Sequence, residues 1–254
     1  MQLPSGNIFV SVVIPCLNEE GQIGAVVRDV LVQGVDEVIV VDNGSTDDTA
    51  QEALTAGARV VREPQRGYGR ACATGLDATD PRCDVVCFLD GDGSDVPAFM
   101  AQIVGPVAGG SADFVMGSRF LGRREPGSMT PQQIFAGWLA GLLLKLAYGV
   151  RFTDMSPFRA MRVSDLRSLG MREMTYGWNL EMQMRVAAAH LRIDEVPVDH
   201  RCRRGGISKV SGNPVAGVKA AFKIMTTFLR LAVTLRRKTA GQSEQPRSLT
   251  GAKV

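Results

Sequence analysis

The sequence lacks any long apolar run that is free of charge. A helix that crosses a membrane needs about 20 such residues. The nearest approach, residues 134–150, is shorter and contains Lys145. The first six residues, MQLPSG, also lack the basic stretch and apolar core of a secretory signal. We therefore expect neither a transmembrane helix nor a signal peptide in this chain of 254 residues.

Strong net charge and paired cysteines are also missing. The net charge of +3 is too small to indicate nucleic acid binding by itself, and we expect no nucleic acid partner. The five cysteines are an odd number without C-x-x-C spacing, which argues against a disulfide framework and a structural zinc site. A reducing, cytoplasmic compartment fits this cysteine usage best.

A glycine-rich dinucleotide fingerprint is absent as well. The turn after the first predicted strand reads Pro15-Cys16-Leu17-Asn18-Glu19, whereas the pyrophosphate of a dinucleotide requires G-x-G-x-x-G. This argues against a nicotinamide-binding protein.

What the sequence does contain is repeated alternation of strand and helix patterns. Buried strands are predicted at 9–15, 37–41, 58–62 and 85–89, with helical spacing between them. A capping-box pattern at 45–48 is predicted to open the second helix. This alternation predicts an α/β fold with a doubly wound, mostly parallel sheet flanked by helices. The loops 15–20, 42–45, 67–70 and 90–95 would meet at its carboxyl edge, where such sheets bind ligands.

The later chain adds further predicted elements. These are a strand at 113–116, a long apolar helix at 131–150, a turn with a short edge strand at 153–160, a helix at 176–190 and an edge strand at 193–198. Pro197 excludes a central position for the last strand because it cannot donate to a ladder.

Asp90 and Asp92 follow the apolar run at 85–89, with a glycine beside each acid. Acids at a buried strand end need compensation by a cation. Asp-x-Asp on a loop suits Mg²⁺ or Mn²⁺, which often bring substrate phosphates with them. The sequence therefore predicts a metal–diphosphate site. The alternative is that both acids only cap a turn and the helix after Pro97.

The C-terminal third carries a basic and amphipathic pattern. Arginines and a lysine surround the glycines of a predicted loop at 201–209, and apolar residues follow at helical spacing from 215 to 229. This pattern predicts an interfacial helix that lies on an anionic membrane, the alternative being a helix packed on the domain. We expect a main domain at 8–212, the amphipathic helix at 213–238 and a disordered tail at 239–254.

Five motifs occur in register, and together they point to a family. They are Val13-Ile14-Pro15 with Asn18-Glu19-Glu20, Asp42 to Asp47, the glycine turn at 67–70, Asp90-Gly91-Asp92, and Gly117-Ser118-Arg119. The set strongly resembles the inverting family 2 glycosyltransferases of GT-A fold over about residues 9–230. The TD-x-x-PFRA motif at 153–160 and the R-x-x-GISK motif at 203–209 resemble polyprenyl-phosphate (dolichol-phosphate mannose synthase type) sugar synthases within that family.

The resemblance implies a nucleotide-sugar site for a UDP- or GDP-hexose. Its predicted residues are Pro15, Leu17, Glu19, Asp42, Ser45, Arg70, Asp90 and Gly91. A carboxylate such as Asp42 suits ribose hydroxyls and base N–H donors because it only accepts hydrogen bonds. The alternatives are that Asp42 caps the following helix and that Arg70 is a surface residue. Asp90 and Asp92 would bind Mg²⁺ or Mn²⁺, with Ser94 as third ligand where these synthases often have glutamine, or with Asp95.

The resemblance also implies an acceptor side. Arg119, Arg203, Ser208 and Lys209 are the predicted acceptor-phosphate residues, since arginine matches phosphate oxygens two at a time. A phosphate acceptor needs no general base, so catalysis would rest on positioning and charge.

An alcohol acceptor would need a base. The predicted catalytic set is therefore Asp92 with Asp154 or Glu181 as the base, unless Glu181 only stabilises its helix N-terminus. His200 is either a metal ligand or an exposed residue of the edge strand. Trp178 is weighed as a sugar platform or membrane contact against a core position.

Three functions are compatible with these motifs. The first is transfer of a sugar from a nucleotide donor to a polyprenyl phosphate, by an enzyme peripheral to the cytoplasmic membrane face. The second is a glycosyltransferase with a soluble acceptor, such as a phosphorylated metabolite or a sugar. The third is a nucleotide-sugar-binding protein without catalysis, against which the intact Asp90-Gly91-Asp92 argues.

Overall fold

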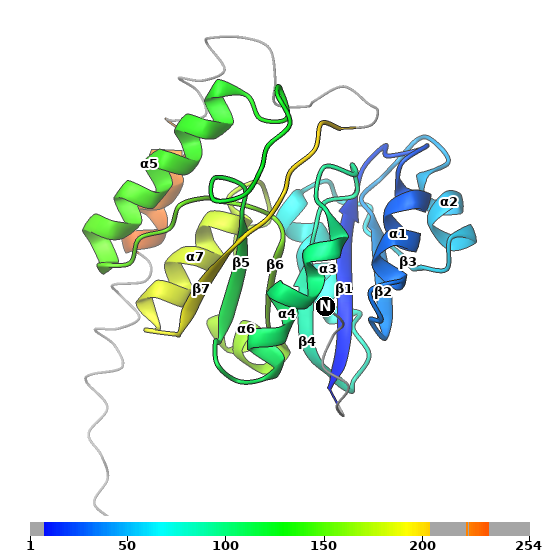
Figure 1. Ribbon diagram of the computed structural model, residues 1–254, viewed down its shortest axis with the longest axis horizontal. Helices are drawn as coiled ribbons and strands as arrows, with labels where there is room; N and C mark the ends of the chain where they lie inside the picture. Colours follow the sequence, from blue (N-terminus) through cyan, green and yellow to red (C-terminus); the bar gives the residue numbers. More distant parts are fainter. Residues whose placement is uncertain (1–7, 204–221, 223, 234–254) are drawn as a thin grey trace, which may run out of the picture.

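The computed structural model describes residues 8–203, 222 and 224–233. A seven-stranded sheet runs through the middle, with helices on both faces (Figure 1). Its strands are β1 (Phe9–Cys16), β2 (Glu37–Asp42), β3 (Arg59–Arg62), β4 (Cys83–Phe88), β5 (Phe114–Ser118), β6 (Arg159–Arg162) and β7 (Ile193–Pro197). Their order across the sheet is β3-β2-β1-β4-β6-β5-β7.

The helices follow the predicted pattern except α6, which was not predicted. They are α1 (Ile23–Leu31), α2 (Thr49–Thr55), α3 (Tyr68–Asp77), α4 (Met100–Ala108) after the short turn η1 (Pro97–Phe99), α5 (Pro131–Tyr148), α6 (Val163–Leu169) and α7 (Trp178–Ala188). A further helical segment comprises residue 222 and residues 224–233.

Alternating side chains of the strands build two cores. Val12 and Ile14 of β1 face the core that α1, α2 and α4 cover. Val13 faces the opposite core, which contains side chains of α3, α5, α6 and α7. Because successive residues of a strand point to opposite faces, a strand that is buried on both faces reads as the unbroken apolar run seen in the sequence. Phe228 and Leu231 of the C-terminal helix are buried in the second core.

The parallel pairing sets the position of the loops. β1 pairs in parallel with β2 and β4, and β2 with β3. β6 is antiparallel to both β4 and β5, so β5 runs in the same direction as β4. The loops after β1, β2, β4 and β5 therefore leave the same edge of the sheet.

Two predictions of local structure were wrong. The strand expected at the sheet edge within 153–160 is β6, which lies between β4 and β5. It tolerates this place because Arg159, although buried, donates to the carbonyls of Asn179 and Ser156. The capping box expected at 45–48 does not form, and α2 begins at Thr49 without a side-chain cap.

The ends of the chain lie mostly outside the described residues. Ser208 and Lys209, the tail at 239–254 and most of the predicted helix at 213–238 are among the residues that are not described. The proposed division at 8–212, 213–238 and 239–254 stays a prediction. None of the described helices is both long and apolar enough to cross a membrane.

Candidate active site

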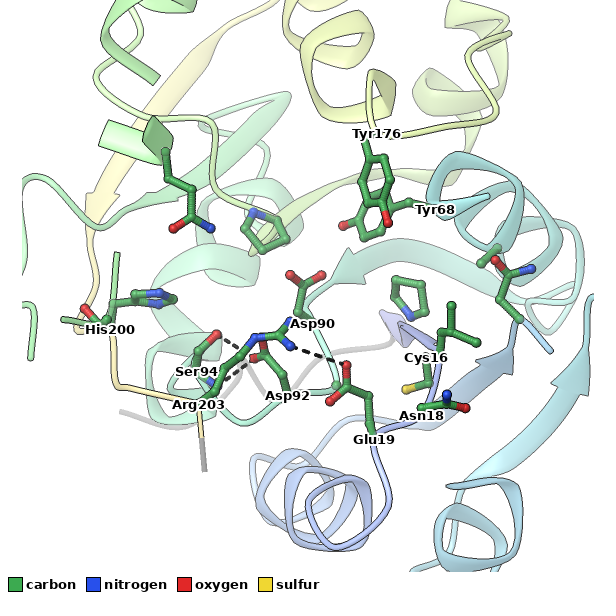
Figure 2. Close-up of a pocket in the computed structure, with 18 of the residues that line it drawn as sticks. Cys16, Asn18, Glu19, Tyr68, Asp90, Asp92, Ser94, Tyr176, His200 and Arg203 are labelled. Atoms are coloured by element: carbon green, nitrogen blue, oxygen red, sulfur yellow. Dashed lines mark hydrogen bonds and ion pairs between the residues drawn. The ribbon is translucent and has the colours of Figure 1, made fainter. Parts of the chain in front are cut away.

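A cavity of about 1000 Å³ opens at the carboxyl edge of the sheet. Figure 2 shows Asp90 and Asp92 on its floor, Glu19 on one side and His200 on the other. Pro15, Leu17, Glu19, Asp90, Gly91, Asp92, Ser94, Arg119 and Arg203, all predicted from the sequence, line this cavity. Residues from loops as distant as 15–19 and 200–203 are thus brought together.

Asp90 and Asp92 line the floor of the cavity, and the buried Asp95 lies behind them. Asp92 accepts from the Ser94 backbone N–H at 2.9 Å and from its hydroxyl at 2.5 Å. The Asp90 N–H donates to Asp95 at 3.1 Å. Burial, together with the charges of Asp92 and Asp95, raises the pKa of Asp90. Burial likewise raises the pKa of Asp95 to about 7. The floor therefore favours binding of a cation.

A cation of the chain itself contacts this floor. The Arg203 Nε lies 2.7 Å from Asp92, and one of its terminal nitrogens lies 4.0 Å from Glu19 (Figure 2). Arg203 is the last described residue before the basic segment that was predicted to bind the acceptor phosphate. An arginine at this place can donate hydrogen bonds to a phosphate group that binds over Asp92.

Two buried atoms near the floor fit an additional cation. Asp90 Oδ1 and His200 Nδ1 make no hydrogen bond to the described residues, and buried polar atoms rarely stay unsatisfied. His200 is buried, not exposed, and burial lowers its pKa to about 4, so the imidazole is neutral. In the described part of the chain, however, no three acid, histidine or cysteine side chains are gathered as a complete metal site. Asp90 and Asp92 would hold such a metal, which would supply positive charge to a bound phosphate group.

The predicted third ligand and its alternative both have other contacts. Ser94 donates its hydroxyl to Asp92. Asp95 accepts from the backbone of Asp90, and the segment around it bridges to His200. Both residues therefore shape the loop that carries Asp90 and Asp92.

The two candidate bases do not line the cavity. Asp154 is buried under Arg119, which donates to it from the backbone at 2.9 Å and from two guanidinium nitrogens at 2.8 Å each. Burial acts to raise the pKa of Asp154, but Arg119 outweighs it and the pKa lies below the usual value. A carboxylate of low pKa is a weak base. Its evident task is to orient Arg119 toward the cavity.

Glu181 is also enclosed. It is fully buried, accepts from the backbone N–H groups of Arg172 and Glu173 at 2.9 and 2.6 Å, and pairs with Arg185 at 2.7 Å. It therefore supports the loop before α7. Trp178, weighed as a sugar platform, is a core residue.

On the nucleotide side, two of the predicted residues lie outside the cavity. Asp42 and Ser45 bond to each other, since the Ser45 N–H donates to Asp42 at 2.8 Å. Neither lines the cavity, whereas Asn43 and Arg66 do. Asn43 is held by Glu63, Gln65 and Gly67. Asn43 was not among the predicted site residues, although it directly follows β2 at the carboxyl edge of the sheet.

Arg70 and the glycine turn contact the loop before α7. The backbone N–H groups of Gly69 and Arg70 donate to the carbonyls of Thr175 and Met174 at 3.2 and 3.0 Å. The first turn of α3 therefore meets a loop of the chain itself, and Arg70 does not line the cavity.

An exposed apolar stripe begins at the cavity. Thr130 and Gln133, which form the capping box of α5, line the cavity. Along the same helix Ile134, Phe135, Trp138, Leu142 and Leu146 are exposed. They are spaced three or four residues apart from Phe135 onward, so they share one face. We call this set the α5 stripe.

Comparisons with known proteins agree with this geometry. The family model "Glycosyl transferase family 2" matches residues 11–170. An uncharacterized glycosyltransferase of Mycobacterium tuberculosis (strain H37Rv) is 38% identical over 211 residues, covering 80% of this chain and 90% of the relative. A low-salt glycan biosynthesis hexosyltransferase of Haloferax volcanii is 34% identical over 77% of this chain and 48% of its own.

A solved structure resembles the whole described fold. It is glucosyl-3-phosphoglycerate synthase from Mycobacterium tuberculosis in complex with Mn²⁺, UDP-glucose and phosphoglyceric acid. Its TM-score is 0.65 at 27% identity, over 89% of this chain and 80% of that one. The expected GT-A type of α/β fold is thereby confirmed.

Proposed function

The chain belongs to glycosyl transferase family 2, and from this premise we propose that it transfers a hexosyl group from a nucleoside diphosphate donor to a polyprenyl phosphate. UDP is the favoured nucleotide because the similar synthase binds UDP-glucose. The single observation that carries the donor site is the pair Asp90 and Asp92 on the cavity floor, facing Arg203.

The residues of the cavity divide into a donor side and an acceptor side. Pro15, Leu17, Asn43 and Arg66 would hold the base and ribose at the end of β1 and β2. The diphosphate would lie over Asp90 and Asp92, where Mg²⁺ or Mn²⁺, when bound, supplies positive charge to the leaving group. Arg203 adds charge from the chain.

The acceptor phosphate would bind at Arg119, which Asp154 holds in place. An oxygen of this phosphate attacks C1 of the hexose, the bond from C1 to the donor phosphate breaks, and the nucleoside diphosphate leaves. Attack from the opposite face inverts the configuration at C1. No proton has to be removed from an anionic phosphate, so this transfer needs no general base.

The α5 stripe favours a lipid as carrier of that phosphate. Its first residues adjoin the cavity wall, so a phosphate at Arg119 can continue into an apolar chain or a membrane along α5. Exposed Phe222, Leu229 and Val233 of the C-terminal helix add apolar surface. We therefore place the enzyme at the cytoplasmic face of a membrane, as a peripheral protein.

A second candidate has its own support. The similar solved structure contains phosphoglyceric acid, so a small phosphorylated metabolite is the competing acceptor. It would use the same Arg119 and would leave the α5 stripe without a role in catalysis.

Binding of the donor is tested by thermal shift with Mn²⁺. UDP-glucose or another nucleotide sugar should raise the melting temperature of the wild type, because a ligand of the native state stabilises it. Asp92→Asn should remove most of the shift. A panel of UDP- and GDP-sugars that leaves the wild-type melting temperature unchanged would contradict the donor site.

Flotation with anionic vesicles separates the two acceptors. Leu146 is 75% exposed on the stripe, and Val32 is 79% exposed after α1, away from it. Leu146→Glu should reduce co-flotation several-fold, whereas the matched Val32→Glu should behave as the wild type. Wild-type protein that stays at the bottom of the gradient would favour the soluble acceptor.

A further inference from the structure

Two tyrosines, neither of them a predicted site residue, form a wall of the cavity. Tyr68 and Tyr176 stack with ring centroids 6.5 Å apart and planes inclined by 15°. Both line the cavity. Figure 2 shows the two rings together on the side of Asp90 that is opposite Asp92 and Glu19.

The glycine turn explains how the wall is built. A Cβ atom at Gly67 or Gly69 would overlap the backbone carbonyl of Met174 or Glu173. Only glycine on both sides of Tyr68 lets the loop before α7 approach this closely. The close approach brings Tyr176 over Tyr68, so the glycine turn holds an aromatic pair at the cavity.

Buried charges behind the loop keep it in place. Glu181 accepts from the N–H groups of Arg172 and Glu173 and pairs with Arg185. Glu173 in turn accepts from Thr175 and pairs with Arg230 of the C-terminal helix. This support fixes the backbone on which Tyr176 stands.

The exposure of Tyr176 and the hydroxyl of Tyr68 both point to a ligand. Tyr176 is 61% exposed although it stands on a fixed loop. Burial raises the pKa of the Tyr68 phenol, and the charge of Asp90 adds to this effect. Although Asn179 lies close enough to act on that pKa, the Tyr68 hydroxyl makes no hydrogen bond of normal geometry to the described residues. A hydroxylated ligand in the cavity could supply the missing partner.

We propose that Tyr68 and Tyr176 form the subsite for the hexosyl ring of the donor. With the base at Pro15 and Asn43 and the diphosphate over Asp90, the hexose has to lie beyond the outer phosphate. The tyrosine pair is the aromatic surface beside Asp90 in the described part of the cavity. An aromatic ring packs against the apolar face of a sugar, and a phenol can bond to a sugar hydroxyl. Glu181 is then a positioning residue for this subsite.

The inference rests on the proposed function, and calorimetry with Mn²⁺ tests the two separately. UDP and UDP-glucose are the probes, with GDP and GDP-mannose if the wild type binds those instead. Tyr176→Ala should weaken binding of the nucleotide sugar roughly 3- to 10-fold, which is the effect of one lost aromatic contact. The same change should alter the affinity for the free nucleotide less than about 2-fold. Tyr176→Phe keeps the ring and should bind as the wild type. Tyr68→Phe should again weaken only the nucleotide sugar, roughly 3- to 10-fold, since one hydrogen bond is lost.

Leu54→Ala on α2, where the side chain is 52% exposed, is the matched control and should leave both affinities unchanged. The subsite would be overturned if Tyr176→Ala lost the same affinity for the nucleotide as for the nucleotide sugar, or if neither tyrosine variant lost affinity. Either result would leave the proposed function intact. Failure of the wild type to bind any of the four probes would overturn the proposed function and the subsite with it.

Discussion

At the scale of single residues, some charged groups line the cavity and others are buried behind it, where they hold the first set in place. Asp90, Asp92, Arg119 and Arg203 line the cavity, while Asp154 and Glu181 are buried behind it. The family resemblance in the sequence implied one site for all of these residues. It could not show which carboxylate is covered, because burial depends on side chains that arrive from distant segments, such as Arg185 for Glu181.

Glu181 gives the clearest test of this separation. Glu181→Gln leaves Arg185 without its buried partner, which should lower the free energy of unfolding by about 3 kcal/mol. Urea unfolding measures this loss. Since Glu181 is not the base in our account, the pH profile of the transfer rate should keep its shape. A stable variant whose profile loses its acidic limb would instead identify Glu181 as the base.

Asp154 gives a pH-dependent test. Its pKa in the folded protein is below the usual value, so the ionised form with Arg119 stabilises the fold above a pH of about 4. This stabilisation is lost as the pH falls through the lowered pKa. Asp154→Asn should therefore cost on the order of 3 kcal/mol at neutral pH, and this cost should shrink as the pH falls below about 4.

Unfolding by urea across that pH range provides the measurement for Asp154. Asp29→Asn, an exposed position on α1, is the control and should show little difference at any pH. A cost for Asp154→Asn that does not change with pH would contradict the ion pair.

At the scale of elements, the strands were predictable and their order was only partly so. The apolar runs of β1, β2 and β4 are long, and their parallel neighbours follow from strand–helix alternation. The four residues of β6 carry arginine at both ends and resemble an edge strand. Their central place depends on the carbonyls that satisfy Arg159, which no local pattern shows. The glycine turn was found, but its partner, the loop at 173–176, lies about 100 residues away in the sequence.

The close packing of α3 on the loop at 173–176 can be tested by adding one methyl group. Gly69→Ala places a Cβ against the Glu173 carbonyl, and overpacking of this kind should cost roughly 1–3 kcal/mol. The control is Gly105→Ala within α4, where a Cβ meets nothing within 4 Å. It should stabilise by about 0.5–1 kcal/mol because alanine favours a helix. Equal effects of both changes in thermal unfolding would contradict the close approach.

At the scale of the whole molecule, one edge of the sheet carries both the cavity and the start of the α5 stripe. The sequence placed the membrane contact in the C-terminal helix, of which part is described. In that part Phe228 and Leu231 are buried in the core, and only one face stays exposed. The longer apolar surface belongs to α5, which the sequence predicted only as a long apolar helix. Periodicity could not decide this, since α5 is apolar on nearly all sides.

The central claim is transfer of a hexose to a lipid phosphate, and partition of the product tests it most directly. The protein is incubated with a radiolabelled nucleotide hexose, Mn²⁺ and vesicles that contain a polyprenyl phosphate, and the mixture is extracted with organic solvent. We predict label in the lipid fraction that requires the metal and falls at least roughly 100-fold in Asp92→Asn. Label that stays wholly in the aqueous phase for every nucleotide sugar the protein binds would contradict the claim.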